Sequence, residues 1–151
     1  MSDTPLLGIV HPVIITRDLE RAMSYYCDVL GFVPRPITTH DPLKIARMGG
    51  PADMAGRAVI LHAPDGSELE IACFTKPDGL AETTAGWQDA GIRSITFRVS
   101  DMAAMLQRLS EAGYGIIREV VTFEIETGAV QVAYVEAPDG VVMSLLQDVA
   151  P

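Results

Sequence analysis

The segment HPVIITRDLERAMSYYCDVLGF, residues 11–32, runs from a strand-like stretch directly into an amphipathic helix. Apolar side chains recur in it with the i, i+3, i+4, i+7 spacing of one helical face. These side chains are Leu19, Ala22, Met23 and Tyr26. Asp18 stands at the expected N-cap, and Gly31 stands where a glycine commonly ends a helix. The segment therefore predicts a strand followed at once by a helix.

A second segment has the same plan. Residues 97–102, FRVSDM, resemble residues 14–19, IITRDL, and a helical pattern again follows the aspartate. The apolar face of this second helix comprises Met102, Met105, Leu106 and Leu109. Gly113 follows it as Gly31 follows the first helix. A period of about half the chain indicates a duplicated module rather than a solenoid of short repeats.

The tetrapeptide Ala-Pro-Asp-Gly also occurs twice, at residues 63–66 and 137–140. Runs of strand-forming residues flank each copy, which is typical of a hairpin turn. Each half therefore predicts a strand, a helix and about three further strands. The helix-start aspartates are 83 residues apart but the tetrapeptides only 74, so the stretch between aspartate and tetrapeptide is nine residues longer in the first half. We expect the extra residues in a loop within Thr38–Arg57.

Composition argues against several classes of protein. The chain has 151 residues, of which 48% are apolar and 21% charged, as in ordinary globular domains. Its net charge of −9 and the lack of a basic stripe argue against nucleic acid or an anionic membrane as a partner. Cys27 and Cys73 are too few for a disulfide framework or a thiolate metal cage. No stretch resembles a membrane span or a secretory leader, so we expect a soluble, cytoplasmic protein.

These residues together resemble the vicinal oxygen chelate superfamily, which includes glyoxalase I, extradiol dioxygenases and bleomycin-resistance proteins. The resemblance rests on His11-x6-Asp18-Leu19, on Tyr25-Tyr26-x3-Leu30-Gly31-Phe32, and on the first hairpin tetrapeptide followed by Glu70. It implies an α+β fold of two βαβββ modules whose curved sheets form a cup. We expect a single domain, residues 1–151, with module one at 7–75, a linker at 76–93 and module two at 94–148.

The resemblance also implies where metal ligands lie. In the superfamily, one ligand stands seven residues before the helix-start aspartate and another seven residues after the start of the hairpin tetrapeptide. His11 and Glu70 fill these positions in module one, whereas Ser94 and Ser144 fill them in module two. Serine hydroxyls bind divalent ions poorly. The implied cofactor is therefore either one divalent metal ion (Zn, Ni, Mn, Co or Fe), held by His11, Glu70 and a third ligand that the sequence does not identify, or none.

The alternation of side chains along strands predicts the residues that line the cup. If His11 and Glu70 face its interior, neighbours of the same parity face it too. Besides those two, the predicted substrate pocket comprises Val13, Ile15, Glu68, Ala72, Ser94, Thr96, Arg98, Val142, Ser144 and Leu146. His40 and His62 are alternatives for a third ligand or a proton-transfer group, but we interpret both as solvated loop or turn histidines.

We therefore hypothesise an enzyme of isomerase or lyase type that acts on a small oxygenated organic molecule. In a metal form, the ion polarises vicinal oxygens and stabilises an enediolate while a carboxylate moves a proton. In a metal-free form, Glu70 is the general base, His11 is its partner or acid, and Arg98 stabilises an oxyanion.

The alternative is a metal-free protein that binds a small molecule or drug, as bleomycin-resistance proteins do. The two module-two serines and the net charge of −9 favour it, because an acidic protein attracts a basic antibiotic or another cationic ligand. The resemblance implies a homodimer in either case. The residues leave open the substrate, the metal and any exchange of modules between chains.

Overall fold

The computed structural model describes residues 8–75, 91–92 and 94–149 of a chain that divides into two compact units. The first unit is Met1–Leu80 and the second is Ala81–Pro151. The boundary between them falls in the predicted linker, most of which lies outside the described residues. Each unit holds one copy of the repeated segment.

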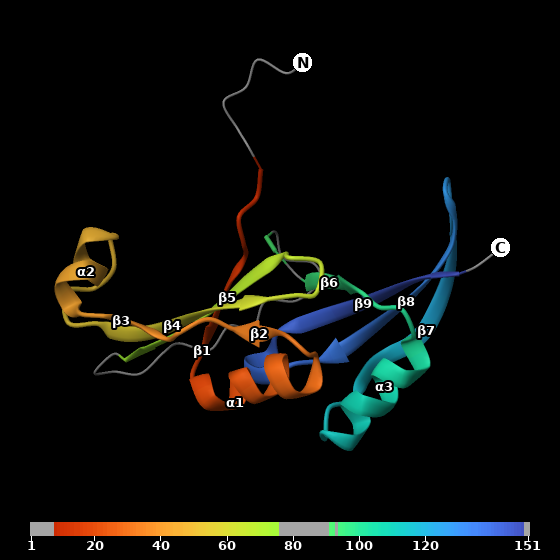
Figure 1. The fold of residues 1–151 in the computed structure, drawn as a ribbon, viewed down its shortest axis with the longest axis horizontal. Helices are drawn as coiled ribbons and strands as arrows, with labels where there is room; N and C mark the ends of the chain where they lie inside the picture. The colour runs from red at the N-terminus through yellow and green to blue at the C-terminus, as the bar shows by residue number, and fades with distance from the viewer. Residues whose placement is uncertain (1–7, 76–90, 93, 150–151) are drawn as a thin grey trace, which may run out of the picture. The chain divides into compact units, whose positions relative to one another are not determined.

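The first unit is built on a sheet with the strand order β1-β5-β4-β2, in which β3 also pairs with β4. Its elements are β1 (Val13–Thr16), α1 (Leu19–Met23), β2 (Val33–Pro34), β3 (Thr38–His40), α2 (Pro42–Arg47), β4 (Ala55–His62) and β5 (Glu68–Thr75). β1 runs parallel to β5, and the other pairs are antiparallel. Figure 1 shows α1 lying along one side of these strands.

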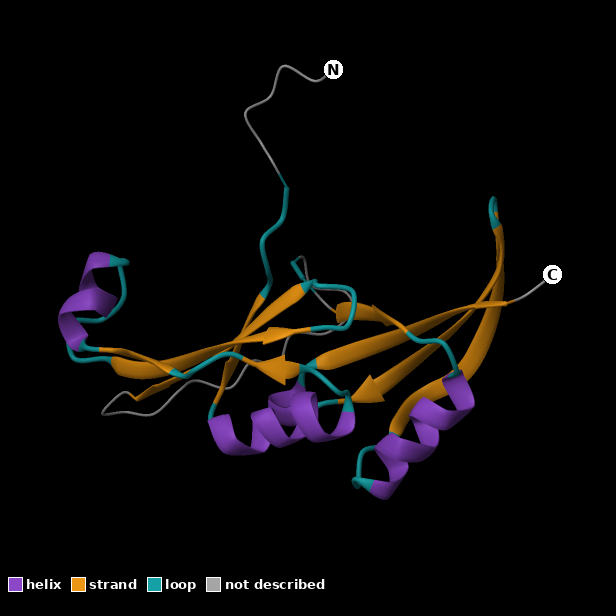
Figure 2. Ribbon diagram, in the orientation of Figure 1, coloured by secondary structure: helices purple, strands orange, loops and turns teal. Residues whose placement is uncertain are grey.

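The second unit repeats this plan with the strand order β6-β9-β8-β7. Its elements are β6 (Ser94–Arg98), α3 (Met102–Glu111), β7 (Ile116–Ile125), β8 (Gly128–Glu136) and β9 (Val142–Val149). β6 is parallel to β9, as β1 is to β5, and Figure 2 shows a helix beside the strands of each unit. The predicted α+β fold of two repeated modules is confirmed. Within the described residues, no helix is long and apolar enough to cross a membrane.

Both repeated helices begin and end as the sequence predicts. The carboxylate of Asp18 accepts a hydrogen bond from the backbone N–H of Arg21 at 2.9 Å, and Asp101 accepts the equivalent bond at the start of α3. Gly31 and Gly113 follow the two helices with φ values of +84° and +85°. Only glycine adopts such a conformation without strain, so both positions stop the helix.

The first helix continues beyond α1 as a π-helical segment, η1 (Ser24–Val29). Its wider winding buries both Tyr25 and Tyr26, whose rings pack edge to face with centroids 5.0 Å apart. The sequence predicted only Tyr26 on this face, because an α-helix turns by about 100° between neighbouring residues. The buried face of the first helix is therefore wider than predicted.

One face of each sheet packs under the helix of its own unit. In the first unit, Leu61, Leu69 and Ile71 are fully buried, and α1 contacts β5. In the second unit, Met143 and Leu145 of β9 are buried, and α3 contacts β9. Because side chains alternate along a strand, the residues between these positions lie on the opposite face of each sheet.

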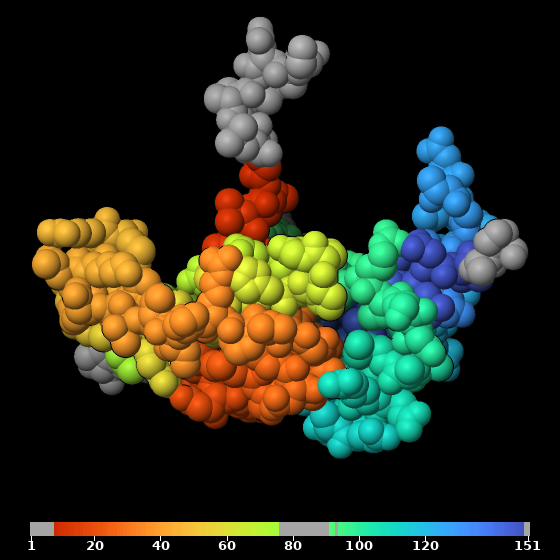
Figure 3. Space-filling view, viewed as in Figure 1, coloured from red at the N-terminus to blue at the C-terminus, as the bar shows by residue number. Residues whose placement is uncertain are grey.

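The region from Thr38 to Arg57 is not the loop that its sequence predicted. It holds β3, α2 and the first residues of β4. The Asp41 side chain caps α2 by accepting a hydrogen bond from the backbone N–H of Lys44 at 2.8 Å, and Pro42 occupies the first helical turn. Asp-Pro is a helix-start signal, but this helix buries only Ile45 and so has no periodic apolar face. Figure 3 shows the segment standing out at one end of the first unit.

The two Ala-Pro-Asp-Gly copies form different turns. In the first, the Gly66 N–H donates to the Ala63 carbonyl, and Ser67 donates to the Asp65 carboxylate through its hydroxyl and its backbone N–H. These bonds hold the pKa of Asp65 below its ordinary value. In the second copy, Pro138–Gly140 form a 3₁₀ turn with Asp139 at φ +60°. The copies share a place in the fold but not a backbone conformation.

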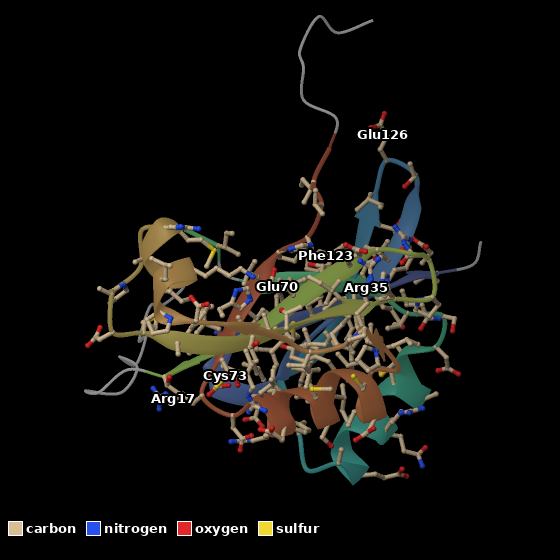
Figure 4. All side chains as sticks on the ribbon, turned by 60° about the vertical axis from the view of Figure 1, so that its left-hand side comes forward. Arg17, Arg35, Glu70, Cys73, Phe123 and Glu126 are labelled. Carbon is tan, nitrogen blue, oxygen red and sulfur yellow. The ribbon has the colours of Figure 1, made fainter. Side chains whose placement is uncertain are left out.

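Both cysteines are free, and each is half-buried. Burial raises the pKa of the Cys27 thiol, and the neighbouring charge of Asp28 raises it further. The Cys73 sulfur lies 3.6 Å from the carbonyl oxygen of Arg17, and Figure 4 shows these two residues close together. The thiols lie on different elements and form no disulfide.

Candidate functional site

The structure brings His11 and Glu70 into direct contact. The Nε2 atom of His11 lies 2.9 Å from the Oε2 atom of Glu70, within hydrogen-bonding distance. Parallel pairing of β1 with β5 sets this contact, because Val13 lies opposite Glu70 and the Glu70 N–H donates to the Pro12 carbonyl at 3.0 Å. The two side chains are 21% and 23% exposed, so both are open to a ligand.

A second carboxylate stands on the other side of the imidazole. Glu68 lies two residues before Glu70 on β5 and therefore on the same face of the sheet. Its Oε2 atom is 3.6 Å from His11 Nδ1, which is within ion-pair range but beyond a hydrogen bond. The Nδ1 atom itself is buried and has no hydrogen-bond partner among the described residues. His11 is therefore bonded through one ring nitrogen and faces a carboxylate with the other.

Arg35 and His62 complete this group of charged side chains. Arg35 Nη2 donates to Glu68 Oε1 at 2.9 Å, and Arg35 Nε donates to His62 Nε2 at 2.5 Å. His62 Nδ1 lies 3.5 Å from Glu68 Oε1. Since Nε2 accepts from Arg35, the proton of a neutral His62 ring is on Nδ1 and points towards Glu68. The interpretation of His62 as a solvated turn histidine is wrong.

We call these five side chains the Glu68 network: His11, Arg35, His62, Glu68 and Glu70. Figure 4 labels two of them, Arg35 and Glu70. Sequence reasoning found three members but missed Arg35 and the role of His62. His62 lies opposite Glu68 in the β4–β5 hairpin, so the turn at residues 63–66 was enough to predict that these two residues pair. Arg35 gave no signal, because it lies 27 residues from His62 and 33 from Glu68 along the chain.

The predicted apolar neighbours of this network lie on the same face of the first sheet. Val13 and Ile15 are 52% and 45% exposed, while the alternate residues of β1, Ile14 and Thr16, are buried. Ala72 shares the face of Glu70, but it is fully buried. Val13 and Ile15 therefore leave two apolar side chains exposed on the face of the carboxylates, whereas the buried Ala72 presents no surface to a ligand.

The module-two residues of the predicted pocket lie on β6 and β9. Ser94 lies opposite Val142, Thr96 opposite Ser144, and Arg98 opposite Leu146. The hydroxyl oxygens of Thr96 and Ser144 are 2.5 Å apart and share a hydrogen bond.

Arg98 and Tyr134 add to the chemistry of that face of the second sheet. The Arg98 guanidinium forms an ion pair with Asp148, and both side chains are largely exposed. Tyr134 of β8 lies opposite Ser144 and therefore shares its face. The sequence could not place Tyr134 there, because the parity of β8 depends on the hairpin register.

A comparison with protein-family models matches residues 8–145 to the Glyoxalase/Bleomycin resistance protein/Dioxygenase superfamily. The chain belongs to this superfamily. The match spans the repeated segments and both hairpin tetrapeptides, so the resemblance seen in the sequence is confirmed.

Individual relatives of this superfamily member are distant in sequence. The chain is 24% identical over 142 residues to "Glyoxylase I 4" of Arabidopsis thaliana, an alignment that covers 93% of the chain and 70% of the plant protein. A glyoxalase family protein from Bacillus cereus superposes with a TM-score of 0.85 at 22% identity and covers 99% of each chain. One from Enterococcus faecalis gives a TM-score of 0.68 at 21% identity and covers 93% and 97%. The solved structures show the fold alone.

Superfamily members often use a divalent metal ion, and the donor atoms of this member do not fit one. The two module-one positions hold His11 and Glu70, which are bonded to each other. Of the two module-two positions, Ser144 is bonded to Thr96. In the part of the chain that the structure describes, no three His, Cys, Asp or Glu side chains are grouped to hold a metal ion. A catalytic metal usually needs three protein ligands, so His11 and Glu70 are too few to hold one.

Proposed function

We propose that this superfamily member is an enzyme that moves a proton on a small oxygenated organic molecule, in an isomerase or lyase reaction, with Glu70 as the general base. The observation that carries the proposal is the Glu70 carboxylate itself. It is half-buried between the buried residues Leu69 and Ile71, and it is bonded to an imidazole that is also accessible. A carboxylate on such a strand is costly unless it is paired or used.

The geometry supports a simple proton transfer. Glu70 takes a proton from a carbon next to a carbonyl group; the C–H electron pair moves into the carbonyl system and forms an enolate. In an isomerase the proton returns to a neighbouring atom, and in a lyase the enolate expels a leaving group. His11 bonds Glu70 Oε2 and so holds the carboxylate while leaving Oε1 for the substrate.

The test is hydrogen exchange from solvent into carbonyl compounds. Hydroxyacetone, dihydroxyacetone and related α-hydroxycarbonyl probes are incubated with the protein in deuterium oxide, and loss of the signal of the proton next to the carbonyl is followed by proton NMR. We expect exchange with the wild-type protein and a loss of at least about a hundredfold in Glu70→Gln. Glu124→Gln, at an exposed position of β7, is the matched control and should exchange at the wild-type rate.

Two outcomes contradict the enzyme proposal. If Glu70→Gln exchanges protons as fast as wild type, Glu70 is not the general base. If the wild-type protein binds a probe but exchanges none of its protons, the protein does not catalyse the proposed proton transfer.

The second candidate is a metal-free binding protein, and the Thr96–Ser144 bond favours it. At the position where the superfamily places a carboxylate ligand, this chain holds a hydroxyl that is already satisfied. The net charge of −9 would draw a cationic ligand. Thermal shift with the basic antibiotic bleomycin tests this: we expect stabilisation that weakens as salt rises. No shift at any salt concentration contradicts it.

Metal content is measured independently of either candidate. Protein purified without chelators is analysed for Zn, Ni, Mn, Co and Fe, beside His11→Ala and Glu70→Gln. Our proposal, which uses no metal, expects substoichiometric metal in all three proteins. Stoichiometric metal in wild type that both variants lose would overturn it.

We also propose that the protein is a cytoplasmic homodimer, in keeping with the dimers that superfamily members often form. Light scattering coupled to size-exclusion chromatography checks the oligomeric state. A mass of 16.2 kDa, that of one chain, at micromolar concentration contradicts the dimer.

A further inference from the structure

We propose that Glu68 is a positioning residue, clamped by Arg35 and His62, that orients the His11 ring and through it the Glu70 carboxylate. The inference deepens the proposed function, on which its catalytic consequence rests. It gives Glu68, Arg35 and His62 a role that does not require contact with a substrate.

The orientation of the His11 ring depends on its side-chain contacts. His11 lies before β1, which begins at Val13, and the nearest backbone bond to β5 is the one that Pro12 accepts from Glu70. The preceding residues Ile9 and Val10 are 93% and 74% exposed and provide no packing. The ring is therefore held by the two carboxylates that flank it, Glu70 at Nε2 and Glu68 at Nδ1.

Glu68, by contrast, is fixed on a rigid element. It opens β5 and lies directly opposite His62 of β4, next to the tight turn that joins the two strands. The Arg35 backbone N–H donates to the Ile60 carbonyl at 2.8 Å, so the arginine is anchored to the same hairpin. The clamp is therefore built on backbone that does not depend on His11.

The charges of the clamp explain why Glu68 turns one oxygen to His11. Arg35 and His62 both contact Oε1, the first at 2.9 Å and the second at 3.5 Å. This leaves Oε2 directed at His11 Nδ1. Arg35 places a cation on Glu68, whose carboxylate otherwise repels that of Glu70 on the same face of the strand. Loss of Arg35 should therefore free Glu68 and, with it, the ring.

The test reads the His11 ring directly by NMR. Nitrogen-15 signals of the imidazole are assigned with His11→Ala and compared in wild type, Glu68→Gln, Arg35→Gln and Arg35→Lys. We expect the His11 signals to move in Glu68→Gln and also in Arg35→Gln, although the side-chain hydrogen bonds of Arg35 go to His62 and Glu68 and not to His11. Arg35→Lys keeps the charge without the planar fork and should give a smaller displacement.

His40 is the internal control, because its ring contacts Thr38 and no member of the Glu68 network. Its signals should stay in place in every variant. An unchanged backbone amide spectrum away from the first hairpin shows that the variants fold. His11 signals that overlay with wild type in both Glu68→Gln and Arg35→Gln overturn the proposal.

A kinetic arm separates this inference from the proposed function. With a probe that exchanges, Glu68→Gln should lower kcat about tenfold or more, because a misplaced catalytic group costs rate, while KM stays within about twofold. Rising KM with unchanged kcat contradicts the positioning role and makes Glu68 a binding residue. If wild type exchanges nothing, the proposed function fails, and the NMR comparison still decides the orientation of His11.

Discussion

Thr96 and Ser144 lie directly opposite each other on β6 and β9, and their hydroxyl oxygens are 2.5 Å apart. Ser144 is buried, while Thr96 is exposed. A buried hydroxyl must find a partner, and Thr96 supplies one. The bond therefore stabilises the parallel pairing of β6 with β9.

We predict that Ser144→Ala lowers the free energy of unfolding by about 1 kcal/mol, the usual net value of such a bond. Thr96→Val leaves the buried Ser144 hydroxyl unpaired and should cost about 1–3 kcal/mol. In a double-mutant cycle followed by urea denaturation, the two losses should be coupled by about 0.5 kcal/mol or more. Strictly additive losses would show that the bond contributes nothing.

Gly56 of β4 is closely packed against β5. A Cβ atom there would lie 2.3 Å from a ring carbon of Phe74 and 2.9 Å from the Cys73 carbonyl oxygen. We predict that Gly56→Ala destabilises the protein by about 1–3 kcal/mol, because the ring and the backbone must both shift. Adding Phe74→Leu should restore part of the loss. Thermal unfolding measures both variants, and a Gly56→Ala protein as stable as wild type refutes the close approach.

The two N-cap aspartates offer a matched pair of variants. Removing the capping carboxylate in Asp18→Ala or Asp101→Ala should cost about 1 kcal/mol each, because a backbone N–H loses its acceptor. Asp18→Asn and Asp101→Asn keep an acceptor oxygen, so the free energy of unfolding should fall by only a few tenths of a kcal/mol. Denaturant midpoints compare the four proteins. Equal losses in alanine and asparagine variants would assign the effect to charge and not to the cap.

The exposed pair Glu20–Arg57 predicts a pH-dependent contribution to stability. Arg57 Nη1 donates to Glu20 Oε1 at 2.9 Å, and this bond lowers the pKa of Glu20 from its ordinary 4.5. A carboxylate with a lowered folded-state pKa stabilises the fold above its unfolded-state value and loses that contribution as pH falls through the folded value. The melting temperature of wild type should therefore exceed that of Glu20→Gln at pH 7. The difference should shrink below about pH 4.5 and also in high salt. A difference that stays constant down to pH 2 contradicts the pairing.

Much of the candidate site followed from the superfamily resemblance and from strand parity. The resemblance implies a ligand position seven residues before Asp18 and another seven residues after Ala63, and the structure brings the side chains at these positions, His11 and Glu70, within 2.9 Å. Strand parity placed Glu68, Val13 and Ile15 on the same face. Such predictions work because each uses only the local period of a strand and one register between neighbours.

Other features could not be predicted because they depend on contacts between distant segments. Arg35 joins the site through side-chain bonds across 27 and 33 residues, and no local pattern marks an arginine as a clamp. Helix α2 was missed because a helix of six residues with one buried side chain has almost no periodicity. The π-helical winding that buries Tyr25 is not marked by any apolar spacing in the sequence.

The sequence by itself determined the duplicated α+β plan, the helix ends and the faces of the strands, because these follow from short-range periodicity, capping and glycine conformation. The tertiary structure alone decided which charges surround His11. A side-chain ion network forms only when folding brings a β2-end arginine, a β4 histidine and a β5 glutamate to one place. The electrostatic energy of this network depends on the distances between its side chains. No local pattern of residues along the chain specifies those distances.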